Sequence, residues 1–211
     1  MSSAISSGAP RTETPPAPAA TRAAALKQAT AALHEKVDTA MMAGEPMSGR
    51  ERYARFVAVQ YRFHQLTRHY FGDPVLNGWF PGLAARERLA AVEQDCRDLG
   101  LDPAQLQEPP LPAPQGPEAL ARAVGWLYVN EGSNLGAAFL YKRALQLGLD
   151  AQFGARHLAP HPDGRMPHWQ QFVAQLNAAP LAPEHEALAI EGARQAFERV
   201  IALARPLAQA G

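Results

Sequence analysis

The chain has 211 residues, 47% of them hydrophobic, and its 20 basic and 20 acidic side chains give a formal net charge of zero. This length is enough for one compact domain that buries roughly 70% of its unfolded surface. The charge balance argues against a nucleic-acid-binding protein, which normally carries a basic excess. Cys96 is the only cysteine, which excludes an intrachain disulfide and any Cys-x-x-Cys site and fits a reducing cytoplasm.

The first 20 residues differ in composition from the rest of the chain. They are rich in Ala, Ser and Pro, and Pro15, Pro16 and Pro18 cannot donate backbone hydrogen bonds. We therefore predict a disordered N-terminal extension over residues 1–20 and one domain over residues 21–211. The sequence shows neither a signal peptide nor a run approaching the ~20 apolar residues of a membrane span, so we expect neither export nor membrane insertion.

Two helices are predicted in the next 50 residues. From Thr21 onward, apolar side chains recur at steps of three and four, as in a helix with one buried face. These side chains are Leu26, Ala29, Leu33 and Val37. A second helix is expected from about Ser48, which is interpreted as its N-cap, to about Tyr70.

The remaining predicted elements are also helical. Turn residues within 71–82 separate the second helix from a third at about 83–99. Six prolines between residues 100 and 117 then indicate an extended connection. Three further helices are expected at about residues 118–147, 168–178 and 183–207. Because no alternating run of strand length appears, the predicted fold class is all-α.

The long helix predicted at 118–147 is apolar but is interrupted at its centre by polar residues 130–134. A helix this hydrophobic should be buried, so its polar residues need partners. It also contains Gly125, Gly132 and Gly136, each of which costs about 1 kcal/mol relative to Ala and favours a bend. Two explanations stay open: close helix–helix packing, or a flat ligand lying across Gly132 and Gly136 against the backbone.

Two residues on the first predicted helix are candidates for ligand binding. His34 lies at the edge of the apolar stripe, and Lys27 precedes it by about two turns on nearly the same face, about 10 Å away along the axis. Such a face can present an imidazole to the iron of a haem and an ammonium to its propionate. The spacing also fits a hydrogen-bonded histidine at the margin of the core, and this alternative stays open.

Four other histidines are expected to have structural roles, whereas His185 is expected to be a solvated surface residue. His64 and His69 point about 140° apart on the second helix, which argues against a shared metal site, and His64 is expected to be hydrogen-bonded in the core. Three histidines in or beside one later loop are expected to hold that loop in place. They are His157, His161 and His168.

Three segments, residues 26–38, 125–136 and 154–164, together resemble bacterial heme oxygenases, most closely the iron-acquisition type of Gram-negative bacteria. The similarity covers about residues 26–203. It implies a single-domain, heme-oxygenase-like helical bundle that binds haem b without a covalent bond. In that arrangement haem lies between a proximal helix, with His34 as the axial iron ligand, and a distal helix kinked at Gly132 and Gly136.

The resemblance also implies roles for further residues. A distal network of side chains and ordered water is assigned to Gln60, His64, Ser133, Asn134 and Trp169. Contacts with the haem propionates are assigned to Lys27 and Tyr128. Phe197 resembles a position that packs near the pocket, although plain core packing is an alternative. Asp38 stands where the family commonly has glutamate, and its shorter side chain is expected to fall short of the His34 imidazole.

The reaction implied by the resemblance is the cleavage of haem by O2 and reductant to biliverdin, carbon monoxide and Fe²⁺, for haem iron acquisition. Opening at the α-meso carbon is expected because Lys27 and Tyr128 match the propionate contacts of α-opening relatives. No flavin or nicotinamide motif is present, so the electron donor is expected to be a ferredoxin or flavodoxin with its reductase. The enzyme is expected to be a monomer.

Two other functions remain as alternatives at this point. A haem carrier or sensor would bind haem through His34 without cleaving the ring. A thiaminase-like hydrolase of the same helical superfamily would bind no haem. Cys96 lies outside the three segments and is expected to be a small core residue, which argues against the hydrolase.

Overall fold

The computed structural model describes residues 21–209, and the predicted disordered extension at residues 1–20 lies outside this range. Within it the chain is built from helices, and the only strand-like pairing is a single bridge between Asp150 and Gly154. The prediction of an all-α fold is therefore confirmed. Across the same range, no helix combines the length and the apolar composition that crossing a membrane requires.

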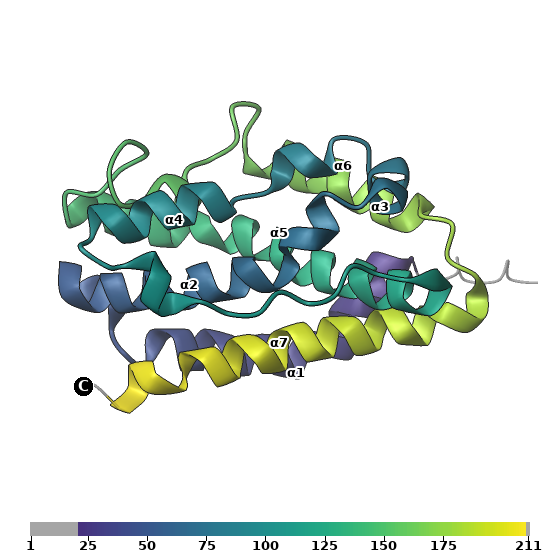
Figure 1. Ribbon diagram of the computed structural model, residues 1–211, viewed down its shortest axis with the longest axis horizontal. Coiled ribbons are helices and arrows are strands. Elements are labelled where there is room, and N and C mark those ends of the chain that lie inside the picture. The colour runs from purple at the N-terminus through teal and green to yellow at the C-terminus, as the bar shows by residue number, and fades with distance from the viewer. Residues whose placement is uncertain (1–20, 210–211) are drawn as a thin grey trace, which may run out of the picture.

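Seven α-helices follow one another along residues 21–209. They are α1 (Arg22–Met42), α2 (Arg50–Phe71), α3 (Pro74–Trp79), α4 (Leu89–Asp98), α5 (Gly116–Gln146), α6 (Arg165–Ala178) and α7 (Glu186–Gln209). Figure 1 shows α1 and α7 side by side along one edge of the molecule, α5 through its middle, and α3, α4 and α6 on the opposite side. Helix α7 packs extensively against both α1 and α5, whereas α1 and α5 have little direct contact with each other.

Three predictions about the helices between residues 48 and 99 were wrong. Ser48 is not the N-cap of α2, because its hydroxyl donates to the carbonyl of Glu45 (2.8 Å) and α2 starts after Gly49. The turn residues before position 82 include the short helix α3, which Asp73 caps by accepting from the backbone N–H of Leu76 (2.9 Å).

The third predicted helix, residues 83–99, is also divided. A 3-10 turn spans Leu83–Arg86, and the α-helix starts only at Leu89. Arg86, the last residue of this turn, is buried. The break therefore matters for the site described below.

Gly125 and Gly192 allow α5 and α7 to approach closely. A Cβ atom at Gly125 would lie 2.0 Å from the carbonyl oxygen of Ala189, and one at Gly192 would lie 2.1 Å from the carbonyl oxygen of Arg122. Both clashes would be with backbone atoms, which cannot move aside as a side chain can. Close helix packing thus accounts for Gly125. Helix α5 continues without interruption through Gly132 and Gly136, and the bend expected there stays a prediction.

Cys96 is completely buried on α4, as expected for a small core residue. Burial, and next the charge of Asp95, raises the pKa of its thiol to about 12. A thiol with such a pKa is not deprotonated at neutral pH and is a poor nucleophile. The structure therefore gives Cys96 no catalytic role.

Candidate functional site

One side of the candidate site is the exposed imidazole of His34 on α1. Its side chain is 64% exposed, and Nδ1 lies 3.1 Å from a carboxylate oxygen of Asp38, one turn later. The expectation that Asp38 falls short of the imidazole was wrong, because side chains four residues apart on a helix lie on the same face and close together. Because Nδ1 faces the Asp38 carboxylate, the other ring nitrogen, Nε2, is the one available to a ligand.

Phe197 of α7 supports the His34 ring. Its side chain is buried, and the centroids of the two rings lie 5.8 Å apart in an edge-on arrangement. Phe197 therefore belongs to the core and also contacts the candidate ligand residue, so the two roles considered for it are compatible. Lys27 lies on the same helix as His34 and is exposed, without a hydrogen bond or ion pair to any described residue.

Two polar residues in the middle of α5, Glu131 and Asn130, have side-chain partners on other parts of the chain. Glu131 forms an ion pair with Arg86 (2.8 Å), and both side chains are almost completely buried. The side-chain amide of Asn130 donates to the hydroxyl of Thr67 (2.9 Å). Burial raises the pKa of Glu131, while the charge of Arg86 opposes this increase. The pair fixes the polar part of α5 against the turn that precedes α4.

Gly132 and Gly136 lie in a different environment from Gly125. A Cβ at Gly132 would make only an ordinary contact, 3.7 Å from the Trp169 ring, and one at Gly136 would have no atom within 4 Å. Helix packing therefore does not explain these two glycines. They leave a stretch of bare backbone on α5 that a flat molecule can approach.

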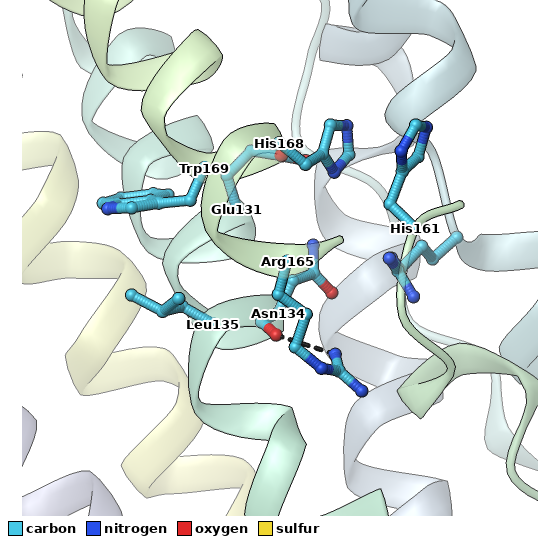
Figure 2. Close-up of a pocket in the computed structure, with 8 residues that line it drawn as sticks. Glu131, Asn134, Leu135, His161, Arg165, His168 and Trp169 are labelled. Atoms are coloured by element: carbon cyan, nitrogen blue, oxygen red, sulfur yellow. Dashed lines mark hydrogen bonds between the residues drawn. The ribbon is translucent and has the colours of Figure 1, made fainter. Parts of the chain in front are cut away.

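A small polar cavity lies beside this stretch, between α5, α6 and the loop that precedes α6 (Figure 2). Its volume is about 10 Å³, enough for about one water molecule. The lining residues are Arg88, Glu131, Asn134, Leu135, His161, Arg165, His168 and Trp169. The side-chain nitrogen of Asn134 and one carboxylate oxygen of Glu131 are buried without a hydrogen-bond partner in the described structure. The cavity thus offers one donor and one acceptor.

Arginine side chains form hydrogen bonds with the backbone of the loop that precedes α6. Arg88 donates to the carbonyls of His157 (2.6 Å) and Ala159 (3.2 Å), and Arg165 donates to the carbonyl of Leu158. Arg165 also donates to the carbonyl of Asn134 on α5 (3.0 Å), the bond drawn in Figure 2. These charged hydrogen bonds hold the loop over α5 and make the cavity wall rigid.

The loop histidines contribute in different ways. Figure 2 shows the rings of His161 and His168 next to each other, and they stack with centroids 4.1 Å apart. His161 Nδ1 also accepts from the backbone N–H of Asp163 (3.2 Å), whereas His157 is bonded to Asp95 of α4. Burial, and next the charge of Arg86, lowers the pKa of His168 to about 4. The predicted structural role of these histidines agrees with their contacts.

The residues predicted to form one distal network are only partly brought together. Trp169 and Asn134 line the cavity, but the hydroxyl of Ser133 donates to the carbonyl of Asn130 in its own helix (2.7 Å). Gln60 is half-buried on α2 and is not among the cavity residues. Tyr128 is half-buried on α5, and its ring lies 5.9 Å from that of Trp169.

His64 is buried on α2, as expected, but its Nδ1 has no hydrogen-bond partner in the described structure, contrary to the prediction. Burial is the main reason that its pKa falls to about 3, and nearby His157 and Arg88 lower it further. His64 is therefore neutral at physiological pH.

The sequence alone did not identify the three arginines around the cavity, Arg86, Arg88 and Arg165. One signal pointed to Arg86, because a carboxylate inside an apolar helix requires a buried cation. The sequence pattern did not distinguish Arg86 from the other arginines, because Arg86 and its partner Glu131 lie 45 positions apart in the chain.

Comparisons with known proteins all match this chain to one family. The family model described as "Heme oxygenase" matches residues 20–205. Heme oxygenase PigA of Pseudomonas aeruginosa is 42% identical over 173 residues, which cover 79% of this chain and 82% of PigA.

Two solved structures have similar folds. The NO- and CO-bound heme oxygenase of Neisseria meningitidis matches with a TM-score of 0.83 and 45% identity, over 90% of this chain and 94% of that one. The heme oxygenase of Leptospira interrogans matches with a TM-score of 0.70 over 88% of this chain and 99% of that one. At 14% identity, this second match shows the fold alone.

Proposed function

The chain belongs to the heme oxygenase family, and we propose that it holds its haem between His34 of α1 and the bare backbone at Gly132 and Gly136 of α5. As a member of this family it is an enzyme that cleaves haem with O2 and a reductant to biliverdin, carbon monoxide and Fe²⁺. Bound haem supplies both the iron that binds O2 and the ring carbon that is oxidised. The protein residues bind, orient and shield it.

The surroundings of His34 fit an axial iron ligand. The ring is exposed on α1, and Asp38 lies 3.1 Å from Nδ1. A carboxylate at this position can orient the ring so that Nε2 points to the iron. The Phe197 ring packs edge-on against the His34 ring. Because Cys96 is the only cysteine and is buried, we propose haem b held without a covalent bond.

The glycines fit the opposite face of the ring. Without side chains at Gly132 and Gly136, the α5 backbone can lie directly against the porphyrin and direct O2 towards one edge. Trp169 lies 3.7 Å from the position that a Gly132 Cβ would take, so it closes one end of this surface.

We propose that the distal side works through water and backbone dipoles, with no ionised side chain directly over the iron. Asn134 and Glu131 can donate to and accept from a water in the small cavity, beside Trp169. His64 is neutral at physiological pH because its pKa is lowered to about 3. Its place in the same water-linked network with Gln60 and Ser133 is proposed from the resemblance.

The orientation of haem within the site is also part of the proposal. The exposed ammonium of Lys27 and the hydroxyl of Tyr128 are assigned to the two propionates, since no other described group competes for Lys27. This orientation leads to opening at the α-meso carbon. Chromatography of the product is the direct check, and a β or δ isomer as the main product would refute it.

The remaining proposals concern the enzyme in the cell. A ferredoxin or flavodoxin with its reductase supplies electrons, and it docks on basic residues at the exposed haem edge. The enzyme acts as a monomer in the cytoplasm, where it releases iron from haem. Its single unpaired cysteine supports the assignment to a reducing compartment.

The observation that carries this function is the combination of an exposed His34, with the Asp38 carboxylate 3.1 Å from its Nδ1, and two α5 glycines that no packing contact explains. The test titrates the protein with hemin and then adds reductant in air while the spectrum is followed. The Soret band is expected to appear in stoichiometric amount and then to decay as biliverdin forms. A haem carrier would keep the band, and a protein without a haem site would never give it.

The His34→Ala variant tests the ligand assignment in the same experiment. We expect this variant to accept some hemin but to form no biliverdin, because the iron loses its imidazole. His69→Ala, on the exposed side of α2, is the matched control and should turn over normally. Normal biliverdin formation by His34→Ala would contradict the assignment.

A further inference from the structure

The first residue of α6, Arg165, joins three parts of the chain around the glycine segment of α5, residues 132–136. Its Nη1 donates to the backbone carbonyl of Asn134 in that segment (3.0 Å), the bond drawn in Figure 2. Its Nη2 donates to the carbonyl of Leu158 in the loop before α6. Because a guanidinium is a rigid, planar fork, one side chain fixes both carbonyls relative to each other. Arg165 therefore couples the α5 backbone to the loop.

Arg86 connects the same two helices about one turn earlier on α5. It pairs with Glu131 (2.8 Å), and it donates to the carbonyl of His168 (3.1 Å) and the side chain of Gln171 (3.0 Å) on α6. The two charged side chains of the pair are almost completely buried. Breaking such a pair would leave an uncompensated charge in the protein interior, at a high cost in free energy. Arg86 thus fixes α5 up to Glu131, the residue before Gly132.

The bonds of Arg165 can open at a lower cost. The side chain is half-buried and bonds to neutral carbonyls, and none of the described carboxylates pairs with it. Burial, and next the charge of Arg88, lowers the pKa of Arg165. A guanidinium that moves into solvent regains its hydration and increases its distance from Arg88. Arg165 is therefore a reversible contact, whereas the pair of Arg86 with Glu131 is a permanent one.

Gly132 and Gly136 lie on either side of the carbonyl that Arg165 holds. A Cβ at either glycine would meet no atom closer than 3.7 Å, so packing does not fix the backbone at these two positions. Glycine also restricts the backbone dihedral angles less than any other residue. Once the bond to Asn134 opens, residues 132–136 can therefore move relative to the loop while Glu131 stays in place.

Exposed apolar side chains follow this contact in the sequence of both helices. Phe139 comes three residues after Gly136 on α5 and is 60% exposed, and Met166 follows Arg165 on α6 and is 50% exposed. Large apolar side chains at the border of a ligand surface can cover an apolar ring when it is bound. The contact made by Arg165 thus lies at the border of the α5 surface proposed to cover haem.

We propose that Arg165 is a latch that holds the glycine segment of α5 against the loop before α6, and that its opening lets haem enter and biliverdin leave. This inference rests on the proposed function. With the latch closed, the α5 backbone lies against the ring. With the latch open, residues 132–136 move away from the ring while the rest of α5 keeps its place. Arg165 is a positioning residue, because it acts through the backbone of Asn134 and Leu158.

The first test measures amide hydrogen exchange in the full chain without haem. Arg165→Met should speed exchange at residues 132–138 by about tenfold or more, the effect of losing one charged hydrogen bond. Residues 118–131 should keep their wild-type rates, because Arg86 still holds Glu131. Unchanged rates at 132–138, or faster exchange along the whole of α5, would overturn the proposal. This arm remains decisive even if hemin does not bind, in which case the proposed function fails separately.

Arg50→Met is the matched control for this measurement. Arg50 also donates to two backbone carbonyls of the α5 region, those of Leu147 (2.8 Å) and Gly148 (3.1 Å), but beyond the C-terminal end of the helix. Its loss should leave exchange at residues 132–138 unchanged. Faster exchange there in Arg50→Met would show that any weakened contact loosens the glycine segment, and it would overturn the assignment to Arg165.

The second test measures the transfer of biliverdin from the enzyme to excess serum albumin after one turnover. Arg165→Met should release biliverdin about tenfold faster than the wild type, and Arg50→Met should match the wild type. Arg165→Lys should also release it faster, because an ammonium keeps the charge but lacks the fork that holds two carbonyls. Release at the wild-type rate by Arg165→Met would overturn the proposal. So would release at that rate by Arg165→Lys, since a positive charge alone would then be sufficient.

Discussion

The two halves of α5 use glycine in different ways. Gly125, in the half that packs on α7, would place a Cβ 2.0 Å from a backbone oxygen, whereas Gly136 would have no atom within 4 Å of its Cβ. The first glycine is required by the fold and the second leaves a face of the helix open. The comparison separates a residue that the packing of the helices requires from a residue that leaves the helix surface open, although both carry the same cost in helix propensity.

The largest expected effect is that of Gly125→Ala. The added methyl group would meet the backbone of Ala189 and Ala193, so α5 and α7 must move apart. We expect the free energy of unfolding to fall by about 3 kcal/mol, at the upper end of the usual cost of overpacking. Urea denaturation of the haem-free protein measures this loss. An unchanged midpoint would show that α5 and α7 are not packed as described.

Glu131→Gln tests the polar part of α5. Arg86 would keep a hydrogen bond but lose its buried anion, and we expect a loss of about 2 kcal/mol in stability. Glu118→Gln, at an exposed ion pair on the same helix, is the matched control and should cost less than about 1 kcal/mol. Equal effects of the two substitutions in urea denaturation would argue against a buried pair.

The contrast between buried and exposed positions extends to the histidines of α2. His64 has its pKa lowered to about 3 by burial, so the folded state binds a proton less readily than the unfolded state, where the pKa is near 6.5. The stability that the neutral, buried His64 contributes is fully present above pH 6.5 and is lost as the pH falls towards 3. We expect about 2 kcal/mol of stability to disappear between pH 7 and pH 5.

His64→Gln should remove most of this pH dependence. His69→Gln, on the exposed side of α2, should preserve it. Denaturation curves at several pH values provide the measurement, and a His64→Gln variant that still loses the full amount would show that other groups are responsible.

The smallest expected effect is that of Gly136→Ala, and its sign is opposite to that of Gly125→Ala. With open space around the new Cβ and a better helix former, the haem-free protein should gain up to about 1 kcal/mol in stability. The same methyl group should weaken hemin binding, because it separates the α5 backbone from the ring. A variant that is more stable and binds hemin as tightly as the wild type would contradict the placement of haem.

The sequence predicted the fold more completely than the site. The periodic apolar residues from Leu26 to Val37 were sufficient to predict α1, because a local pattern determines the buried face of a helix. The short helix α3 was missed because Asp73 and Pro74 also signal a turn. The N-cap at Ser48 was wrong because the hydroxyl bonds backwards to Glu45, a preference that the pattern did not reveal.

The site depends on contacts between distant residues, which a single sequence does not encode locally. The need for a partner to Glu131 was predictable, but its identity as Arg86 required the three-dimensional arrangement. Gly125 could not be distinguished from Gly136, because the deciding neighbour, Ala189, lies 64 positions later. The reach of Asp38 was misjudged from side-chain length, although one helical turn brings the carboxylate to 3.1 Å from His34.

In the proposed complex, His34 binds the iron while the bare backbone of α5 lies on the other face of the ring. The most direct measurement is the resonance Raman spectrum of the ferrous haem complex. We predict an iron–imidazole stretching band in the wild type that is lost in His34→Ala and returns when imidazole is added to that variant. A band that persists in His34→Ala without added imidazole would contradict the account.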